Sequence, residues 1–338
     1  MSLNPQERML ELMAKTKPAM RLKDGEDFAS WQKKARARLG ELLGLPMETV
    51  SDSNFRVEWT DETADFTETR FLFESEPSVT VDCHLLVPDD VKEEKIPLII
   101  CLQGHAKGMH ISLGRPKYEG DENSIYGGDR NFAVQAIARG QAALTVEQRG
   151  FGDRGGTPAG PACNQPAVQA LLLGKTLIGQ RVWDISRAID EVEKHFPMID
   201  MDRIACMGNS GGGTATIYAA AMDERITAAM PSCAFCGYLP SIGAQHHCIC
   251  NYIPGIMNDF DMGDLAGLIA PRPFVAVNGT FDTIFPLDSA NEQYAVAEKY
   301  YAAAGASDKC AHVIGPEGHR FYAAISWPVF DRCTGWKK

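Results

Sequence analysis

Six short, almost continuously apolar runs constrain the fold of this chain more than any other feature. They are IPLIICL (96–102), AALTVE (142–147), RIACMG (203–208), ITAAM (226–230), PFVAVNG (273–279) and CAHVIG (310–315). Runs of this kind indicate strands that are buried on both faces, as in a parallel sheet. Helix-like segments separate them, and the clearest spans 181–196, where apolar residues recur at helical spacing. The alternation predicts an α/β fold with a mostly parallel, doubly wound sheet.

The residues before these runs predict a helical extension and an antiparallel hairpin. Residues 5–43 are rich in helix formers, and we expect Asp27 or Ser30 to cap a helix that Gly44 and Pro46 end. The alternating segments TRFLFES and SVTVDCHLLVP follow, with a turn between them, and predict the hairpin. We therefore predict a helical N-terminal extension over 1–60 and an α/β domain over 61–338, with a cap-like insertion at about 232–262.

Charge and composition exclude several classes of partner. The formal net charge of −11 over 338 residues argues against nucleic acid and against an anionic membrane surface. No apolar run approaches the length of a membrane helix. The N-terminal MSLNPQERMLELMAKTK has no apolar core of signal-peptide length, and several of the ten cysteines lie in strand-like runs, which is typical of buried thiols. We expect a cytoplasmic protein; the alternative is that MSL replaced a native leader.

A serine stands among glycines in CMGNSGGGTA (206–215), directly after one of the apolar runs. Gly208, Ser210 and Gly212 fit the pattern G-x-S-x-G, in which the serine occupies a strained turn from strand to helix. The neighbouring glycines avoid collisions at this turn, and the following helix directs its N-terminal amides toward developing negative charge. The pattern predicts that Ser210 is a nucleophile; the alternative is a flexible glycine-rich turn.

The acid and the base of a catalytic triad have candidates in later loops. Asp282 follows the run PFVAVNG, whereas its rival Asp288 opens a helix-like segment in which Ser289 and Glu292 would form a capping box. His319 lies in a glycine-containing loop after the last apolar run, in VIGPEGHRF. We expect the other candidates to be structural, because His312 lies within a strand and His195 lies at a helix end. The predicted triad is Ser210, Asp282 and His319.

Two backbone amides are predicted to form the oxyanion hole. One belongs to Gly211, which follows the nucleophile, and the other belongs to His105 in the loop QGHAKG after the run at 96–102. The alternative for His105 is a loop histidine without a role.

The order Ser210, Asp282, His319 and the segments around these residues resemble the α/β-hydrolase superfamily, from IPLIICLQGH to GPEGHRF. More narrowly, the chain resembles the branch that holds dienelactone hydrolases and acetyl xylan esterases. The similar segments are EQRGFGDRG (147–155), LIGQRVWDISRAIDEVE (177–193) and DLAGLIAPRPFVAVNGTFDTIFP (264–286). The chain departs from that branch at three positions, where Phe151 and Gly211 replace glutamines and Arg320 replaces a glutamate. Arg149 and Asp184 match positions of the family, and we expect structural roles for both.

The resemblance implies a serine-dependent carboxylic ester hydrolase that acts through an acyl-enzyme, with acetyl xylan or other sugar esters as one substrate class. This chemistry needs no cofactor and no metal. The expected partner is a small-molecule or saccharide ester, and the sequence does not predict the oligomeric state. The alternatives within the same chemistry are a dienelactone hydrolase-like enzyme and a peptidase-type serine hydrolase.

An alternative of another class comes from CAFCGYLPSIGAQHHCICNYIPG (233–255). The side chains of this segment would make the protein a zinc-binding protein if four of them gathered around one ion; they are Cys233, Cys236, His246, His247, Cys248 and Cys250. The spacing differs from that of zinc ribbons, which pair two separated C-x-x-C elements. We therefore favour a pocket-lining cap, in which Phe235, Tyr238, Tyr252 and the histidines face the substrate.

Overall fold

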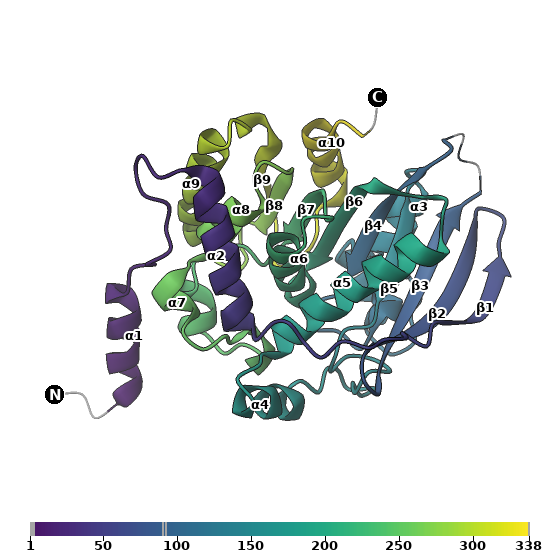
Figure 1. Ribbon diagram of the computed structural model, residues 1–338, viewed down its shortest axis with the longest axis horizontal. Coiled ribbons are helices and arrows are strands. Elements are labelled where there is room, and N and C mark those ends of the chain that lie inside the picture. Colours follow the sequence, from purple (N-terminus) through teal and green to yellow (C-terminus); the bar gives the residue numbers. More distant parts are fainter. Residues whose placement is uncertain (1–3, 90, 92, 337–338) are drawn as a thin grey trace.

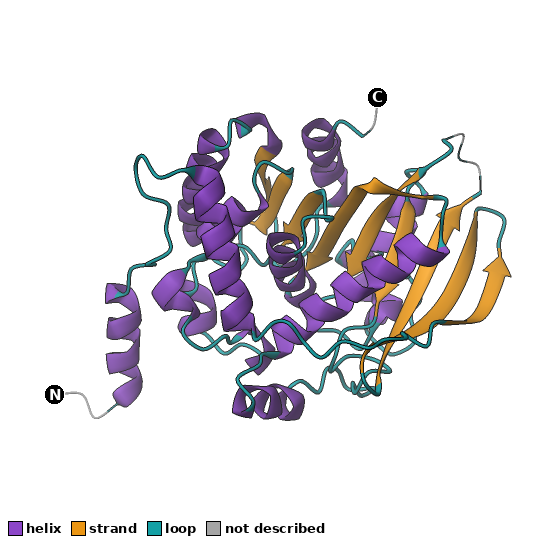
Figure 2. Cartoon of the chain, viewed as in Figure 1, coloured by secondary structure: helices purple, strands orange, loops and turns teal. Residues whose placement is uncertain are grey.

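A nine-stranded mixed sheet runs through the part of the chain that the computed structural model describes, which is residues 4–89, 91 and 93–336 (Figures 1 and 2). The strands are β1 (Arg56–Glu62), β2 (Phe66–Glu76), β3 (Val79–Pro88), β4 (Ile96–Leu102), β5 (Ala142–Val146), β6 (Ile199–Asn209), β7 (Ala228–Ser232), β8 (Phe274–Gly279) and β9 (Cys310–Gly315). Their order in the sheet is β1-β2-β3-β5-β4-β6-β7-β8-β9.

The sheet divides into an antiparallel part and a parallel part. Strands β1, β2, β3 and β5 pair antiparallel, and β5, β4, β6, β7, β8 and β9 pair parallel. The register places Ile100 of β4 between Leu144 of β5 and Cys206 of β6. The predicted α/β fold and the predicted hairpin, which is β2 and β3, are confirmed. Strand β1 was not predicted, because all seven of its residues are exposed and its sequence, RVEWTDE, is mostly polar.

Side-chain alternation explains why the parallel strands are apolar at nearly every position. Leu98, Ile100 and Leu102 of β4 point into one hydrophobic cluster, and Ile99 and Cys101 point into another on the opposite face. A strand between two helix layers therefore carries few polar side chains on either face. The strand predicted at 226–230 is observed two residues later in the sequence, because β7 spans Ala228–Ser232.

The helices form a layer on each face of this sheet. The helices of the described residues are α1 (Pro5–Lys15), α2 (Phe28–Leu43), α3 (Phe132–Ile137), α4 (Asn164–Leu172), α5 (Leu177–His195), α6 (Gly211–Met222), α7 (Ile256–Asp259), α8 (Met262–Ile269), α9 (Leu287–Ala303) and α10 (Ala323–Thr334). Helix α1, which has no buried residue, lies outside both layers (Figure 1). The cluster on one face includes side chains of α2, α5, α6 and α8; Figure 1 shows α5 and α6 in front of the sheet, and α2 packs against α5, α6 and α8. The opposite cluster includes side chains of α3 and α10.

The N-terminal helices follow the expected signals in part. Asp27 caps α2 by accepting a hydrogen bond from Ser30 N at 2.9 Å, and Gly44 ends the helix in the left-handed conformation at φ 76°. The segment 5–43 holds two helices, and α1 lies against the body beside α7 (Figure 1). The predicted boundary at residue 60 falls within β1, and the division into extension, main domain and cap stays a prediction.

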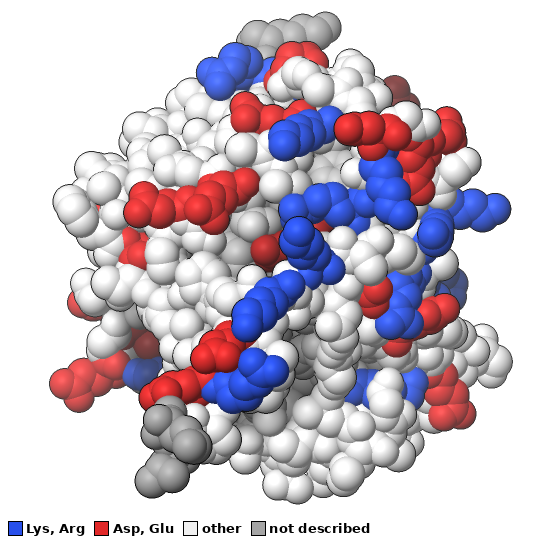
Figure 3. Space-filling view, turned by 90° about the vertical axis from the view of Figure 1, so that its left-hand side faces the viewer, with Lys and Arg blue, Asp and Glu red and all other residues white. Residues whose placement is uncertain are grey.

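Opposite charges adjoin on the face that carries these helices. Arg38 of α2 pairs with Glu41 and with Asp259, both at 2.8 Å, and Figure 3 shows basic and acidic side chains interspersed there. Among the described residues, none of the helices has both the length and the apolar character that a membrane span requires.

Candidate active site

Ser210 occupies a strained turn between β6 and α6. It lies between Asn209, the last residue of β6, and Gly211, the first residue of α6, with φ 57° and ψ −123°. A non-glycine residue in such a conformation costs about 1–3 kcal/mol, so the surrounding structure must hold it. Two backbone hydrogen bonds do so, because Ser210 N donates to Ser232 O and Thr214 N donates to Ser210 O, each at 2.8 Å.

The glycines two residues before and after Ser210 allow the backbone to pack closely. A Cβ on Gly208 would lie 2.5 Å from the carbonyl carbon of Gly212 and 2.6 Å from the carbonyl oxygen of Leu102. A Cβ on Gly212 would overlap the same oxygen of Leu102. The spacing G-x-S-x-G therefore reflects the close approach of β6, α6 and the end of β4.

Asp282 and His319 form a hydrogen-bonded pair. His319 Nδ1 lies 2.8 Å from Asp282 Oδ2, and Asp282 Oδ1 accepts hydrogen bonds from Ile284 N at 2.9 Å and Phe285 N at 3.2 Å. Burial of the Asp282 carboxylate opposes its charge, but the His319 ring and the two backbone N–H groups outweigh burial and lower the pKa of Asp282. The carboxylate thus stays ionised and orients the imidazole, with Nε2 as the remaining ring nitrogen.

The rival residues have other surroundings. Asp288 lies in the first turn of α9, where a carboxylate complements the helix dipole. The predicted capping box was wrong, because α9 already begins at Leu287 and the hydroxyl of Ser289 accepts a hydrogen bond from Gly237 N at 2.9 Å. His312 Nε2 lies 3.1 Å from Asn278 Oδ1, and burial lowers the pKa of His312 to about 4.

The three predicted triad residues follow neighbouring parallel strands at the same edge of the sheet. Ser210 follows β6, Asp282 follows β8 and His319 follows β9, and the carboxyl ends of parallel strands share one edge. Ser232, at the end of β7, links them, since its carbonyl accepts from Ser210 N and its hydroxyl donates to Arg320 O at 3.4 Å. No hydrogen bond joins the Ser210 hydroxyl to the His319 ring within the described residues, and in unliganded enzymes such bonds are often long and tighten with substrate.

The two predicted oxyanion-hole residues adjoin. A Cβ on Gly211 would lie 2.6 Å from Cε1 and Nδ1 of the His105 ring, so this ring packs directly on Gly211. Neither the His105 amide nor the Gly211 amide has an acceptor among residues 4–89, 91 and 93–336. A Cβ on Gly104 would lie 3.2 Å from Cβ of Ser210, which places the loop after β4 against the nucleophile. Both amides are therefore free to bind an oxyanion beside Ser210.

Glu147 is a buried carboxyl that the sequence analysis did not single out. Gln103 Nε2 donates to Glu147 Oε1 at 2.6 Å and Met109 N donates to Oε2 at 3.0 Å, so the side chain links both ends of the loop that carries His105. Burial raises the pKa of Glu147 to about 7. Its position after an apolar strand, where charged residues are rare, was the available signal.

The Cys- and His-rich segment does not gather as the sequence suggested. Cys233 lies beside Asp282 and His319, with ligand atoms within 4.8 Å of one another, whereas Cys236 packs against Phe285. Cys248 and Cys250 join His105 and Cys163, residues that were not among the candidate ligands, and their ligand atoms also lie within 4.8 Å of one another.

Part of the predicted cap faces inward. Phe235 is fully buried against Phe274, and Tyr238 is buried with its hydroxyl hydrogen-bonded to Tyr218, so the expectation that both face substrate was wrong. Tyr252 is 40% exposed and lies at the surface.

Two of the cavities differ in their relation to the triad edge. One of about 890 Å³ is lined by His246, His247 and Tyr252 together with residues near α4. The His247 ring contacts Phe285, with centroids 5.4 Å apart, and Phe285 stacks on His319 at 5.9 Å, so Phe285 contacts both a wall residue of this cavity and the proposed base.

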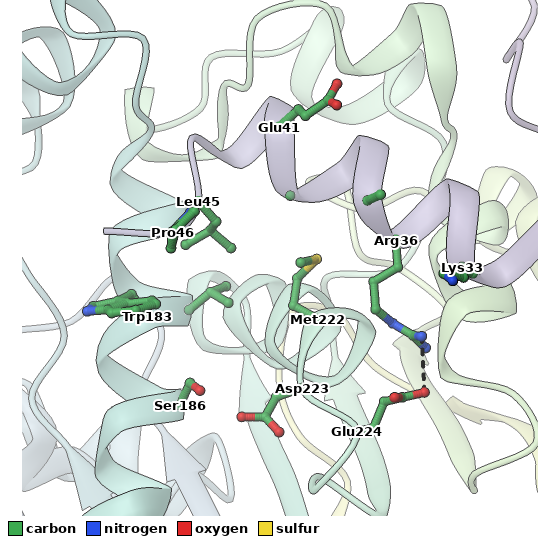
Figure 4. Close-up of a pocket in the computed structure, with 13 residues that line it drawn as sticks. Lys33, Arg36, Glu41, Leu45, Pro46, Trp183, Ser186, Met222, Asp223 and Glu224 are labelled. Carbon is green, nitrogen blue, oxygen red and sulfur yellow. Dashed lines mark ion pairs between the residues drawn. The ribbon is translucent and has the colours of Figure 1, made fainter. Parts of the chain in front are cut away.

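The other cavity, of about 760 Å³, lies between α2, α5 and the end of α6 (Figure 4). It includes Met222, the last residue of α6, and Arg36, which pairs with Glu224 at 3.0 Å. Twelve helical residues separate this end of α6 from Ser210, a distance of about 18 Å. The cavity in Figure 4 is therefore not part of the triad edge.

Ion pairs fix the loop after β5. Arg149 donates to both carboxylate oxygens of Asp184, at 2.8 and 2.7 Å, and Arg154 donates to the same carboxylate at 2.7 Å. Asp184 is buried, and burial opposes its charge, but the two arginines lower its pKa below the ordinary range. These contacts agree with the structural roles expected for Arg149 and Asp184.

Comparison with known proteins agrees with this fold. A model of the Abhydrolase family matches residues 6–303. The candidate hydrolase YtaP of Bacillus subtilis (strain 168) is 27% identical over 237 residues, which are 69% of this chain and 77% of YtaP. A solved candidate acetyl xylan esterase from Bacteroides fragilis NCTC 9343 superposes with a TM-score of 0.74 at 17% identity, over 97% of this chain and 84% of that one. The glucuronoyl esterase from Solibacter usitatus superposes with a TM-score of 0.72 at 18% identity, over 96% and 100% of the two chains.

Proposed function

Because the chain belongs to the Abhydrolase family, we propose that it is a carboxylic ester hydrolase in which Ser210 is the nucleophile, His319 the base and Asp282 the acid. The observation that carries the proposal is the 2.8 Å hydrogen bond between Asp282 and His319, at the sheet edge where the strained turn presents Ser210. A nucleophile, an oriented base and free amides at one edge are the parts that acyl transfer requires.

The reaction proceeds in two steps. His319 Nε2 takes the proton of the Ser210 hydroxyl as the oxygen attacks the ester carbonyl, and Asp282 stabilises the resulting imidazolium. The amides of His105 and Gly211 bind the oxyanion, and each such donor contributes about 3–4 kcal/mol in comparable sites. The alcohol leaves with the proton from His319, and water then attacks the acyl-enzyme by the same route.

We propose saccharide esters as the substrate class. Solved proteins with this fold include ones named as acetyl xylan and glucuronoyl esterases, which supports this class through fold alone. The cavity beside His247 has mostly apolar walls, in which Asn164, Gln165 and His246 supply hydrogen-bonding groups of the kind that a sugar hydroxyl needs. Lactones of the dienelactone type and peptides are the competing substrates.

Replacing the nucleophile tests the proposal. Ser210→Ala is expected to abolish hydrolysis of p-nitrophenyl acetate while leaving the circular dichroism spectrum unchanged, and Ser30→Ala, at an exposed position of α2, is the matched control. Retained hydrolysis by Ser210→Ala would refute the assignment. Acetylated xylo-oligosaccharides, a glucuronoyl ester, a dienelactone and a peptide, assayed with the wild type, then decide the substrate class.

A further inference from the structure

Four side chains with metal-binding atoms converge beside the candidate oxyanion hole. They come from three segments that lie far apart in the sequence: His105 follows β4, Cys163 precedes α4, and Cys248 and Cys250 lie at a short 3₁₀ helix, Ile249–Asn251. The imidazole nitrogen and the three sulfur atoms all lie within 4.8 Å of one another, and His105 Nε2 is 3.0 Å from Cys250 Sγ. All three thiols are free.

The distances between the imidazole nitrogen and the three sulfur atoms suit an ion with tetrahedral coordination. In a site with Zn–S bonds of about 2.3 Å and a Zn–N bond of about 2.0 Å, neighbouring ligand atoms lie about 3.5–3.8 Å apart. Three cysteines and one histidine are a ligand set of structural zinc sites. Cys163 and Cys250 are buried, so little rearrangement of solvent is needed to enclose an ion.

The charge of the surroundings fits such a site. Arg181 is buried, with 1% of its surface exposed, and its guanidinium donates to Cys163 Sγ at 3.2 Å. No carboxylate in the described part of the chain forms an ion pair with it, although a buried cation requires a counter-charge. Three thiolates and one Zn²⁺ carry a net charge of −1, which the guanidinium neutralises.

Two departures from the family that the chain resembles also contact His105. The Phe151 ring packs edge-on against the His105 ring, with centroids 5.3 Å apart. Gly211 leaves room for the same ring, because a Cβ there would lie 2.6 Å from it. A glutamine at position 211 would displace the His105 ring, so these substitutions accommodate the imidazole where it faces the cysteines.

We propose that His105, Cys163, Cys248 and Cys250 bind one Zn²⁺ ion. Four protein ligands leave no open coordination position, so the ion is structural. It ties the loop that supplies the oxyanion-hole amide of His105 to the start of α4 and to the cap. The ion thereby holds that amide in place, and its binding does not depend on the nature of the substrate.

Metal analysis tests this proposal. The 338-residue chain, purified under reducing conditions and dialysed against Zn²⁺ and then against buffer, is expected to retain about one zinc ion per chain by mass spectrometry of its metals. Cys163→Ala and Cys248→Ala are expected to retain less than about a tenth of that amount. Cys236→Ala is the matched control, because Cys236 is a buried cysteine of the same segment that lies outside the cluster, and it is expected to keep the ion.

Further measurements keep the proposal falsifiable if the cysteine variants do not fold. The wild-type chain reconstituted with Co²⁺ is expected to give the thiolate-to-metal charge-transfer bands and the strong visible absorption of a tetrahedral site. Substoichiometric zinc without such bands, full zinc in Cys248→Ala, or a disulfide between the cluster cysteines would each overturn the proposal. Ser210→Ala is expected to keep the ion, so a failed triad assignment and a failed metal site give different results.

Discussion

Replacing Asp282 by asparagine tests the orientation of the proposed base. The carboxylate uses Oδ1 to accept two backbone N–H groups, from Ile284 and Phe285, and uses Oδ2 to accept from His319 Nδ1. An asparagine of the same shape keeps its oxygen toward the two backbone donors, because its NH₂ group cannot accept from them. The NH₂ group then faces His319 Nδ1, which must give up its proton and place it on Nε2.

The expected loss follows from that change of tautomer. With a proton on Nε2 the imidazole cannot accept one from Ser210, and the corresponding change in a related triad lowers kcat about 10⁴-fold. This loss corresponds to about 5.5 kcal/mol of transition-state stabilisation. The fold should persist, since the backbone hydrogen bonds to position 282 remain.

The assay is the hydrolysis of p-nitrophenyl acetate, with kcat and KM measured separately and Tm measured by differential scanning fluorimetry. Asp282→Asn is expected to lose kcat while Tm stays within a few degrees of the wild type. The control is Asp288→Asn, the rival carboxylate in the first turn of α9, which should alter kcat little and cost about 0.3–1 kcal/mol of stability. If Asp282→Asn keeps kcat within tenfold of the wild type, or Asp288→Asn proves the more damaging, the assignment of the acid is wrong.

Two further predictions concern the packing and the pH dependence of the site. Gly212→Ala should lower the free energy of unfolding by about 3 kcal/mol or more and abolish activity, because the added Cβ would overlap the Leu102 carbonyl oxygen. The control is Gly40→Ala, whose added Cβ meets only the flexible end of the Met222 side chain, and it should change the midpoint of urea unfolding little. The native pKa of Glu147 is raised to about 7 from 4.5, so the native state holds a proton that the unfolded state releases between these values, and the free energy of unfolding falls as pH rises through them. In urea titrations, the wild type should lose about 2–3 kcal/mol more free energy of unfolding between pH 5 and pH 8 than Glu147→Gln does. An equal pH dependence of the two proteins would contradict a raised pKa for the buried Glu147 carboxyl.

The parallel sheet and the triad candidates could be predicted because their signals are local. A strand buried on both faces is apolar throughout, and the turn at Ser210 needs glycines at fixed positions, so each feature is present in a short stretch of sequence. The succession of strands then indicates which loops meet, because carboxyl ends of parallel strands share an edge. Asp282 and His319 were found in this way, and they do form a pair.

The remaining features depend on contacts between distant segments, which spacing in the sequence does not report. Cys233 and Cys236 are close in the sequence, but the chain turns after β7, so that Cys233 lies beside Asp282 and His319 whereas Cys236 packs against Phe285. Cys163 joins Cys248 and Cys250 only because α4 packs beside the cap. The inward-facing Tyr238 likewise has a partner far away in the sequence, because its hydroxyl hydrogen-bonds Tyr218 of α6.

Covalent labelling tests the central claim, that a proton relay makes the hydroxyl at position 210 unusually nucleophilic. The wild-type protein is treated with a small organophosphate, and the adduct is located by intact-mass and peptide mass spectrometry. The account predicts one phosphoryl group per chain, on Ser210, with activity lost in proportion to labelling and no adduct in Ser210→Ala or Asp282→Asn. Full inhibition with Ser210 unmodified, or equal labelling of the Asp282→Asn variant, would contradict it.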